Sequence, residues 1–123
     1  MKVIQTQKAP AAVGPYSQAI EVNGLIFTSG QLPIIPESGE LINDDIKKAT
    51  ARSLENIKEI LEAAGSSLDK VVKTTCFLKD INDFKAFNEI YAKYIKEKPA
   101  RSCIAAADLP GGFLVEVEVI AEI

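Results

Sequence analysis

The sequence predicts an α+β domain in which a mixed sheet of about six strands carries two helices on one face. Three observations support this class. Two segments have apolar residues at helical spacing, several others alternate polar and apolar residues, and the order along the chain is strands, helix, strand, helix, strands. The chain has 123 residues, of which 47% are hydrophobic and 25% are charged. Residues 1–123 are therefore expected to form a single domain around one core.

The first predicted elements are strands joined by a tight turn. Asn23-Gly24 separates the two runs Ser17–Val22 and Leu25–Ser29. Asn-Gly is the preferred pair for a two-residue type I′ turn because both positions need a positive φ, so these runs are predicted to form a hairpin. A shorter strand is predicted at Val3–Thr6. The prolines and the glycine in Gln31–Leu41 indicate a loop or an irregular edge.

The first helix follows this loop. Asp44 or Asp45 can cap its N-terminus, and Gly65 stands where a helix is commonly terminated. One face of the helix is expected to be buried, and it consists of Ile46, Ala49, Ser53, Ile57, Ile60, Leu61 and Ala64.

The run Val71–Leu78 alternates and is predicted to be a strand. One of its faces is expected to carry Val72, Thr74, Cys76 and Leu78, and the other Val71, Lys73, Thr75 and Phe77. The second helix is expected to be capped by Asn82 or Asp83 and to end before Pro99. Its residues at helical spacing are Phe84, Phe87, Tyr91, Tyr94 and Ile95.

The C-terminal part of the chain is predicted to hold a short strand, a turn and a long strand. The short strand is Ser102–Ala106, and Asp108–Gly112 forms the turn. In the final run, Phe113–Ile123, apolar and acidic residues alternate, as in a strand with one buried face.

Two helices can cover only one face of such a sheet, and the other face still carries apolar side chains. A monomer would leave those side chains in water. An apolar patch of this kind usually marks an interface between chains. We therefore expect a homo-oligomer.

Composition excludes several classes of function. The chain has no His, which removes His-based triads, His general bases and nearly all His-rich metal sites. A formal charge of −3 and the absence of a Lys/Arg cluster argue against a dedicated nucleic-acid surface. Cys76 and Cys103 are expected to be free thiols in a reducing compartment, with one bridge between them as the alternative. No targeting or membrane segment is recognisable, so a cytoplasmic location is expected.

Arg101 is the first candidate for a functional residue. It enters a predicted strand directly after a proline-bounded turn, a position that can aim a side chain into a cleft. A guanidinium can bind a carboxylate through two parallel hydrogen bonds, which Lys cannot do. The alternative is an ion pair at the surface or between subunits.

Glu116 and Glu118 share a face of the last strand, where they either meet solvent or hold a water molecule in a pocket. Tyr16 either donates a phenolic hydrogen bond or simply packs. Asn88, in the second predicted helix, is more commonly a surface residue than a site residue. Cys103 has no evident base to form its thiolate, so it is interpreted as a wall residue of a site rather than a nucleophile.

Five phrases, in order along the chain, carry a resemblance to a known family. They are Gly14-Pro15-Tyr16-Ser17-Gln18-Ala19, Thr28-Ser29-Gly30-Gln31, Val72-Lys73-Thr74-Thr75, Pro99-Ala100-Arg101-Ser102-Cys103 and Val115-Glu116-Val117-Glu118-Val119-Ile120-Ala121. At these phrases the chain closely resembles the RidA (YjgF-type) family. The resemblance runs over essentially the whole chain.

The resemblance implies a chorismate-mutase-like fold, assembled as a homotrimer with clefts between subunits. It also implies an enamine/imine deaminase that works without a cofactor or metal. Such an enzyme hydrolyses 2-imino acids, namely 2-iminobutanoate and 2-iminopropanoate, to 2-keto acids and ammonia. These imines arise when pyridoxal-phosphate dehydratases act on serine or threonine.

The resemblance also assigns roles to individual residues. Arg101 is expected to bind the substrate carboxylate and Glu116 to position the attacking water. The other residues expected to contact substrate are Tyr16, Ser29, Gly30, Asn88 and Cys103.

Three other functions remain open at this stage. The same pocket could sense 2-keto acids without turnover, because sensing and catalysis both need Arg101. A ribonuclease or translation inhibitor fits poorly with the acidic charge, the lack of His and the lack of interleaved aromatic and basic residues. A chaperone-like role has no support beyond the expected oligomer face.

Overall fold

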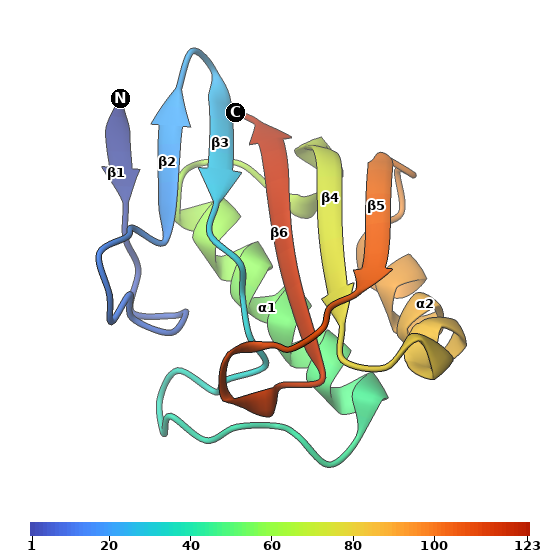
Figure 1. The fold of residues 1–123 in the computed structure, drawn as a ribbon. Helices are drawn as coiled ribbons and strands as arrows, with labels where there is room; N and C mark the ends of the chain where they lie inside the picture. Colours follow the sequence, from blue (N-terminus) through green and yellow to red (C-terminus); the bar gives the residue numbers. More distant parts are fainter.

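The computed structural model describes residues 1–123 and contains one six-stranded sheet and two α-helices (Figure 1). The strands are β1 (Lys2–Ile4), β2 (Ala19–Val22), β3 (Leu25–Thr28), β4 (Val71–Leu78), β5 (Ala100–Ala105) and β6 (Val115–Glu122). The helices are α1 (Ile46–Ala63) and α2 (Phe84–Tyr94). Short 3₁₀ turns lie at Leu68–Lys70, Ile81–Asp83 and Pro110–Gly112.

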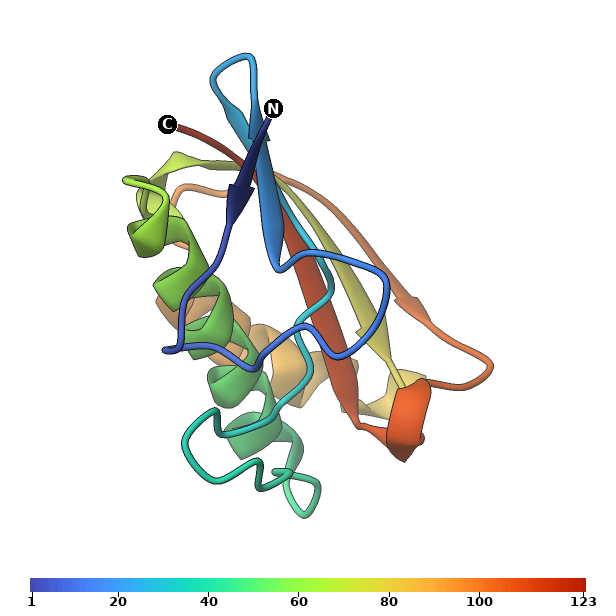
Figure 2. The same ribbon diagram turned by 90° about the vertical axis from the view of Figure 1, so that its left-hand side faces the viewer.

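The sheet is mixed, with the strand order β1-β2-β3-β6-β4-β5. Only β4 and β5 are parallel, because α2 carries the chain back before β5 begins. β6, the last strand, lies in the middle of the sheet between β3 and β4. Both helices pack on the same face, and Figure 2 shows the other face without a helix. The predicted α+β architecture is therefore confirmed.

The alternation in β6 explains how the core forms. Val115, Val117, Val119 and Ala121 are all buried on the face that the helices cover. Burial of a valine side chain contributes about 1.5–3 kcal/mol, so this row is a major source of stability. Glu116 and Glu118 point to the opposite face, where both are half-buried.

Asp45, rather than Asp44, caps α1: its carboxylate accepts a hydrogen bond of 3.1 Å from the backbone N–H two residues on. The helix ends just before Gly65, as predicted. Its buried face is wider than the sequence pattern indicated, since Thr50, Leu54 and Asn56 are also fully buried. Two of these residues are polar, which is why a count of apolar spacing omits them.

The predicted faces of β4 hold for most of the strand but are wrong at its start. Val71 is 5% exposed and Val72 is 39% exposed, the reverse of the predicted alternation. The register against β6 shifts between Val71 and Lys73, which is a β-bulge. The extra residue moves Val71 onto the helix-covered face, while Thr74, Cys76 and Leu78 keep their predicted burial.

The start of α2 also differs from the prediction. Asp80 provides the cap, since its carboxylate accepts a hydrogen bond of 2.9 Å from the N–H of Asn82. A 3₁₀ turn at Ile81–Asp83 precedes the α-helix, and the side chain of Asp83 makes no capping bond. The local sequence pattern does not distinguish this 3₁₀ turn from the first turn of an α-helix.

The hairpin turn is confirmed, with φ of 51° at Asn23 and 76° at Gly24. β1 is shorter than predicted and ends at Ile4. The N–H of Thr6 instead donates to the side-chain oxygen of Gln18 at 2.7 Å, so the chain leaves the sheet there. β5 starts earlier than predicted, because Ala100 already pairs with Lys73.

The face without helices exposes apolar side chains from several strands. Val3 is 55% exposed, Phe27 39% and Ile104 51%. Each pairs with a residue that also points away from the helices, so the patch crosses the whole sheet. None of the helices is long and apolar enough to span a membrane.

Candidate functional site

The predicted site residues fall into two groups on opposite faces of the sheet. Asn88, Arg101 and Cys103 lie on the face covered by helices, at the edge formed by β5 and α2. Glu116 lies on the other face of the sheet, with Gly30 against it. Within one chain, the sheet therefore separates the predicted carboxylate-binding cation from the predicted water-positioning carboxylate.

The register of the parallel strands determines the direction of Arg101. Arg101 pairs with Thr74, whose buried hydroxyl lies 2.8 Å from the hydroxyl of Tyr91 on α2. Arg101 therefore points toward α2, where its Nη1 donates a hydrogen bond of 2.7 Å to Oδ1 of Asn88. The structure thus brings together two residues that are 13 positions apart in sequence.

Two aromatic rings support the guanidinium of Arg101. Its Cζ lies 4.8 Å from the ring centroid of Tyr91 and 5.5 Å from that of Phe84. Both distances are within the range of cation–π attraction. The rings fix the plane of the guanidinium without neutralising its charge. Their helical spacing in the sequence predicted one face of the second helix and gave neither ring a role in the site.

No carboxylate in the chain neutralises Arg101. The only ion pair joins Lys47 to Glu89 on the protein surface, at 2.8 Å. Apart from the bond to Asn88, the guanidinium makes no hydrogen bond, and none of its nitrogens is both buried and unpartnered. Its remaining N–H groups therefore reach solvent and can bind an anion. The alternative of an ion pair is excluded within a single chain.

Cys103 lies on the same face of β5 as Arg101 and is half-buried. Burial raises the pKa of its thiol, and the nearby positive charge of Arg101 only partly offsets this. Burial raises the pKa of the adjacent Cys76 to about 12. Both cysteines are free thiols. Cys103 is therefore protonated near neutral pH, in agreement with a wall residue rather than a nucleophile.

Glu116 sits against the backbone of the segment that follows β3. Gln31 forms an isolated bridge with Val117, through hydrogen bonds of 2.8 Å and 3.2 Å. This bridge places Gly30 directly beside Glu116, so that a Cβ at Gly30 would overlap the carboxylate. Glycine is needed here for the close approach itself.

The environment of Glu116 changes its acidity. Burial raises the pKa of the carboxyl group, and the negative charge of Glu118 raises it further. No cation forms an ion pair with either glutamate. A carboxylate with a raised pKa is a better proton acceptor than an ordinary one, which suits a group that holds or deprotonates water.

Ser29 and Tyr16 belong to the same side of the molecule as Gly30. The Ser29 hydroxyl donates a hydrogen bond of 2.6 Å to the carbonyl of Ser17, so its proton serves to join the two strands of the hairpin. Only its acceptor capacity remains for a ligand. Tyr16 is 52% exposed and lines a cavity with Gly30.

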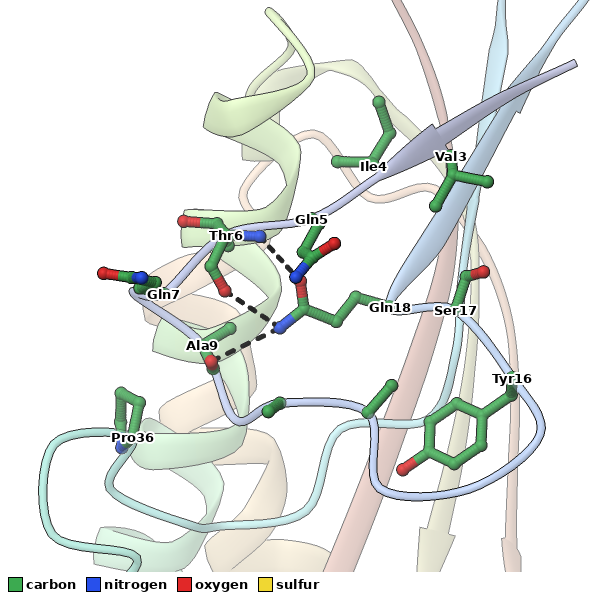
Figure 3. A pocket seen from close by; sticks show the side chains of 12 residues that line it. Val3, Ile4, Gln5, Thr6, Gln7, Ala9, Tyr16, Ser17, Gln18 and Pro36 are labelled. Atoms are coloured by element: carbon green, nitrogen blue, oxygen red, sulfur yellow. Dashed lines mark hydrogen bonds between the residues drawn. The ribbon is translucent and has the colours of Figure 1, made fainter.

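Gln18 is a structurally important residue that was not predicted from the sequence. It is buried, and its Nε2 donates to the carbonyls of Thr6, Ala9 and Pro10 at 2.8–3.3 Å. Figure 3 shows the bonds to Thr6 and Ala9. Its side chain holds the N-terminal loop closed beside a cavity of about 540 Å³. Its place two residues after Tyr16 in the Gly-Pro-Tyr phrase was the available signal.

A second cavity of about 310 Å³ adjoins Gly30. Its walls come from the N-terminal loop and from the loop after β3, and the residues are Pro10, Ala11, Val13, Tyr16, Gln18, Gly30, Gln31, Leu32, Ile34, Pro36 and Gly39. This lining is mainly apolar, apart from the phenol and the two amides.

The chain contains no cluster of three or more His, Cys, Asp or Glu residues that could hold a metal ion.

Comparison with known proteins places this arrangement in context. The family described as Endoribonuclease L-PSP matches residues 6–123. Reactive Intermediate Deaminase A of the Arabidopsis thaliana chloroplast is 50% identical over 121 residues, which are 98% of this chain and 65% of that protein.

Two solved structures are similar over the whole chain. RidA from the Antarctic bacterium Psychrobacter sp. has a TM-score of 0.95 and 46% identity, with 100% of both chains covered. TdcF of E. coli with bound serine has a TM-score of 0.95 and 42% identity, with 100% of this chain and 99% of that chain covered. The fold, the matched phrases and these relatives agree, and the chain belongs to the RidA (YjgF-type) family.

Proposed function

We propose that the protein is an imine deaminase, which hydrolyses 2-imino acids such as 2-iminobutanoate and 2-iminopropanoate to 2-keto acids and ammonia. The main support for this proposal is the environment of Arg101. Asn88 and two aromatic rings hold its guanidinium, and no carboxylate in the chain pairs with it. Such a group suits the carboxylate of a small acid. The relative named Reactive Intermediate Deaminase A supports the same reaction class.

The complete site is proposed to form between two copies of the chain in a homotrimer. Arg101 and Glu116 lie on opposite faces of one sheet, so one copy cannot bring them to the same substrate. Arg101 is on β5, an edge strand, and Glu116 is on the face that exposes apolar side chains. A head-to-tail contact that places one copy's β5 edge beside its neighbour's open face would unite them, and such a contact forms a closed ring when the rotation between copies allows closure.

The chemistry in such a site requires only water. Arg101 would fix the carboxylate, which also fixes the adjacent imine carbon. A water molecule held by Glu116 would attack this carbon of the protonated imine and pass a proton to the carboxylate, giving a tetrahedral carbinolamine. Return of that proton to nitrogen makes ammonia the leaving group. As the C–N bond breaks, the hydroxyl proton passes to the Glu116 carboxylate and the keto acid forms. Positioning accounts for most of the acceleration, because the reaction becomes effectively unimolecular.

The substrates are reactive intermediates, so an enzyme that forms them must work nearby. Dehydratases that use pyridoxal phosphate release 2-imino acids when they act on serine or threonine. We propose such enzymes as the functional partners of this protein. The reaction itself transfers no electrons, and the residues of the chain are sufficient for the proposed steps without a cofactor.

A coupled assay tests the proposal. A threonine dehydratase generates 2-aminocrotonate, and semicarbazide traps the imine that forms from it. The wild-type protein should suppress semicarbazone formation, whereas Arg101→Ala should not. Glu116→Ala tests the role of the water. If the wild type leaves the rate of semicarbazone formation unchanged, the protein is not an imine deaminase.

A second candidate is a sensor of 2-keto acids or related small molecules without turnover. The serine bound in the structure of TdcF favours this candidate, because the ligand there is a small amino acid. Calorimetric titration with 2-ketobutyrate distinguishes the two functions when it is combined with the trapping assay. A sensor would bind the keto acid and leave the imine untouched.

A further inference from the structure

Asn56 is a buried polar residue in the middle of α1 and lies outside both groups of predicted site residues. Its side chain is 0% exposed. Its Nδ2 donates two hydrogen bonds, one to the carbonyl of Leu32 at 3.1 Å and one to the carbonyl of Ile34 at 2.9 Å. These carbonyls are 24 and 22 residues away in sequence. Asn56 therefore joins the helix to the loop after β3.

Arg52 fixes the orientation of the Asn56 amide. Nη2 of Arg52, one helical turn earlier, donates a hydrogen bond of 2.8 Å to Oδ1 of Asn56. A rotation of the amide by 180° would lose this bond and turn Oδ1 toward the carbonyls of Leu32 and Ile34. The guanidinium thus ensures that both N–H groups of Asn56 point to the loop.

The loop held by Asn56 forms one wall of the 310 Å³ cavity. Leu32 and Ile34 both line this cavity, as do Gly30 and Gln31 just before them. The other fixed point of the loop is the bridge between Gln31 and Val117, next to Glu116. Gly30, whose backbone approaches the Glu116 carboxylate, is the residue immediately before this bridge.

We propose that Asn56 is a positioning residue for the proposed deaminase site, which acts by holding the cavity wall at Leu32 and Ile34 and so supports the adjoining Gln31–Val117 bridge that sets Gly30 beside Glu116. The inference rests on the proposed function. Asn56 touches no substrate. Its contribution is to keep the cavity wall and the water-holding carboxylate in one arrangement during turnover.

Asn56→Asp is the most direct test. The aspartate has nearly the same shape and keeps a partner for Arg52, but it presents an oxygen instead of an NH₂ group to the two loop carbonyls. Thr50→Val is the matched control. Thr50 is equally buried on the same helix, but its hydroxyl donates only to the carbonyl of Ile46 within α1.

Two measurements on the intact protein separate positioning from a general loss of stability. The first is kcat and KM in the trapping assay, at a temperature where thermal unfolding shows each variant to be fully folded. In Asn56→Asp, kcat should fall about tenfold or more while KM changes little, because the carboxylate-binding Arg101 is unaffected. Thr50→Val should keep both constants near the wild-type values.

The second measurement is hydrogen exchange of the loop amides that bond within the loop, Ile34, Ile35 and Ile42. They should exchange faster in Asn56→Asp, and the amides of β4 should not change. Unchanged loop exchange, or a folded variant with wild-type kcat, would overturn the inference. A wild type without turnover would contradict the proposed function instead, and the exchange result would then decide alone whether Asn56 holds the loop.

Discussion

Arg101 combines a neutral hydrogen-bond partner, an aromatic platform and a free charge. This combination is unusual for a surface arginine, which commonly meets a carboxylate. Asn88 and the rings of Phe84 and Tyr91 set the plane of the guanidinium before any ligand arrives. A preorganised donor pair of this kind reduces the cost of ordering the site when the ligand binds.

Arg101→Lys should lose most of the activity that Arg101→Ala loses. The ammonium keeps the charge over the rings, but it cannot bind a carboxylate through two parallel hydrogen bonds. Removal of a positioned charge commonly costs about 2–4 kcal/mol of transition-state stabilisation, or roughly two to three decades in rate. Measurement of kcat/KM for both variants checks this. Near-wild-type activity in the lysine variant would show that charge alone is enough.

Glu118→Gln should move the acid limb of the pH–rate profile to lower pH. Glu116 must be ionised to accept a proton from water, so kcat/KM falls as the pH drops through its pKa. Burial and the charge of Glu118 both raise this pKa from 4.5. Removal of the second charge lowers the pKa, but burial keeps it above the ordinary value. A limb that stays in place, or moves upward, would contradict the assigned role of Glu116.

Cys103→Ala should retain most of the activity. The pKa of the Cys103 thiol is raised by burial, so little thiolate is present near neutral pH to act as a nucleophile. We expect kcat/KM within about fivefold of the wild-type value, against a loss of about a hundredfold or more for Arg101→Ala. A loss in Cys103→Ala as large as that in Arg101→Ala would assign covalent chemistry to the thiol.

At the scale of elements, the contact between β6 and the loop after β3 governs one half of the site. The bridge between Gln31 and Val117 extends the pairing of β6 past the end of β3. It thereby places Gly30 against Glu116. Glu116 can shift to relieve an overlap, because its carboxylate is the far end of a flexible side chain. A change at Gly30 should therefore affect the chemistry more than the stability.

Gly30→Ala should reduce kcat/KM about tenfold or more with little change in the free energy of unfolding. The new Cβ would lie 2.6 Å from Cδ of Glu116, so the carboxylate must leave its place. In a Glu116→Ala background the same substitution meets no carboxylate and should have no further effect. Kinetics of the four proteins in this cycle measure the coupling. Equal losses in both backgrounds would show that Gly30 acts independently of Glu116.

The elements were predictable from sequence to the extent that local periodicity determines them. The alternation in β6 and the Asn23-Gly24 turn predicted the strand and the hairpin, since one buried face and two positive φ angles leave few alternatives. The bulge at Val72 and the cap at Asp80 were not predictable. The bulge depends on how β4 pairs with β6, which is distant in sequence. The Asp80 cap is local, but three neighbouring residues, Asp80, Asn82 and Asp83, are all common capping types.

The residues of the candidate site could be predicted from the sequence, but their arrangement in space could not. The resemblance named Arg101 and Glu116, but only the pairing of β5 and of β6 with β4 shows that they lie on opposite faces. The supporting residues were missed for a related reason. Gln18 and Asn56 are buried amides whose partners are backbone carbonyls of distant loops, and a sequence pattern does not identify such partners.

At the scale of the whole molecule, the proposed homotrimer would explain both the open sheet face and the separation of Arg101 from Glu116. Exposed Val3, Phe27 and Ile104 would be covered by a second copy, and the same contact would complete the site.

An RNA-cleaving function fits the molecule less well, despite the family's description as an endoribonuclease. The chain has a net charge of −3, which does not favour binding to RNA, and it has no His to act as the usual general base.

Mixed oligomers of two inactive variants test the central claim most directly. Arg101→Ala and Glu116→Ala subunits, combined in equal amounts by co-refolding, should give about one quarter of the wild-type activity. This fraction follows because about a quarter of randomly formed head-to-tail interfaces would pair an intact Arg101 with a neighbour's intact Glu116. Either variant mixed with the double variant serves as the control and should remain inactive. If the mixture is no more active than the separate variants, Arg101 and Glu116 do not work together across an interface, and the proposed shared site is wrong.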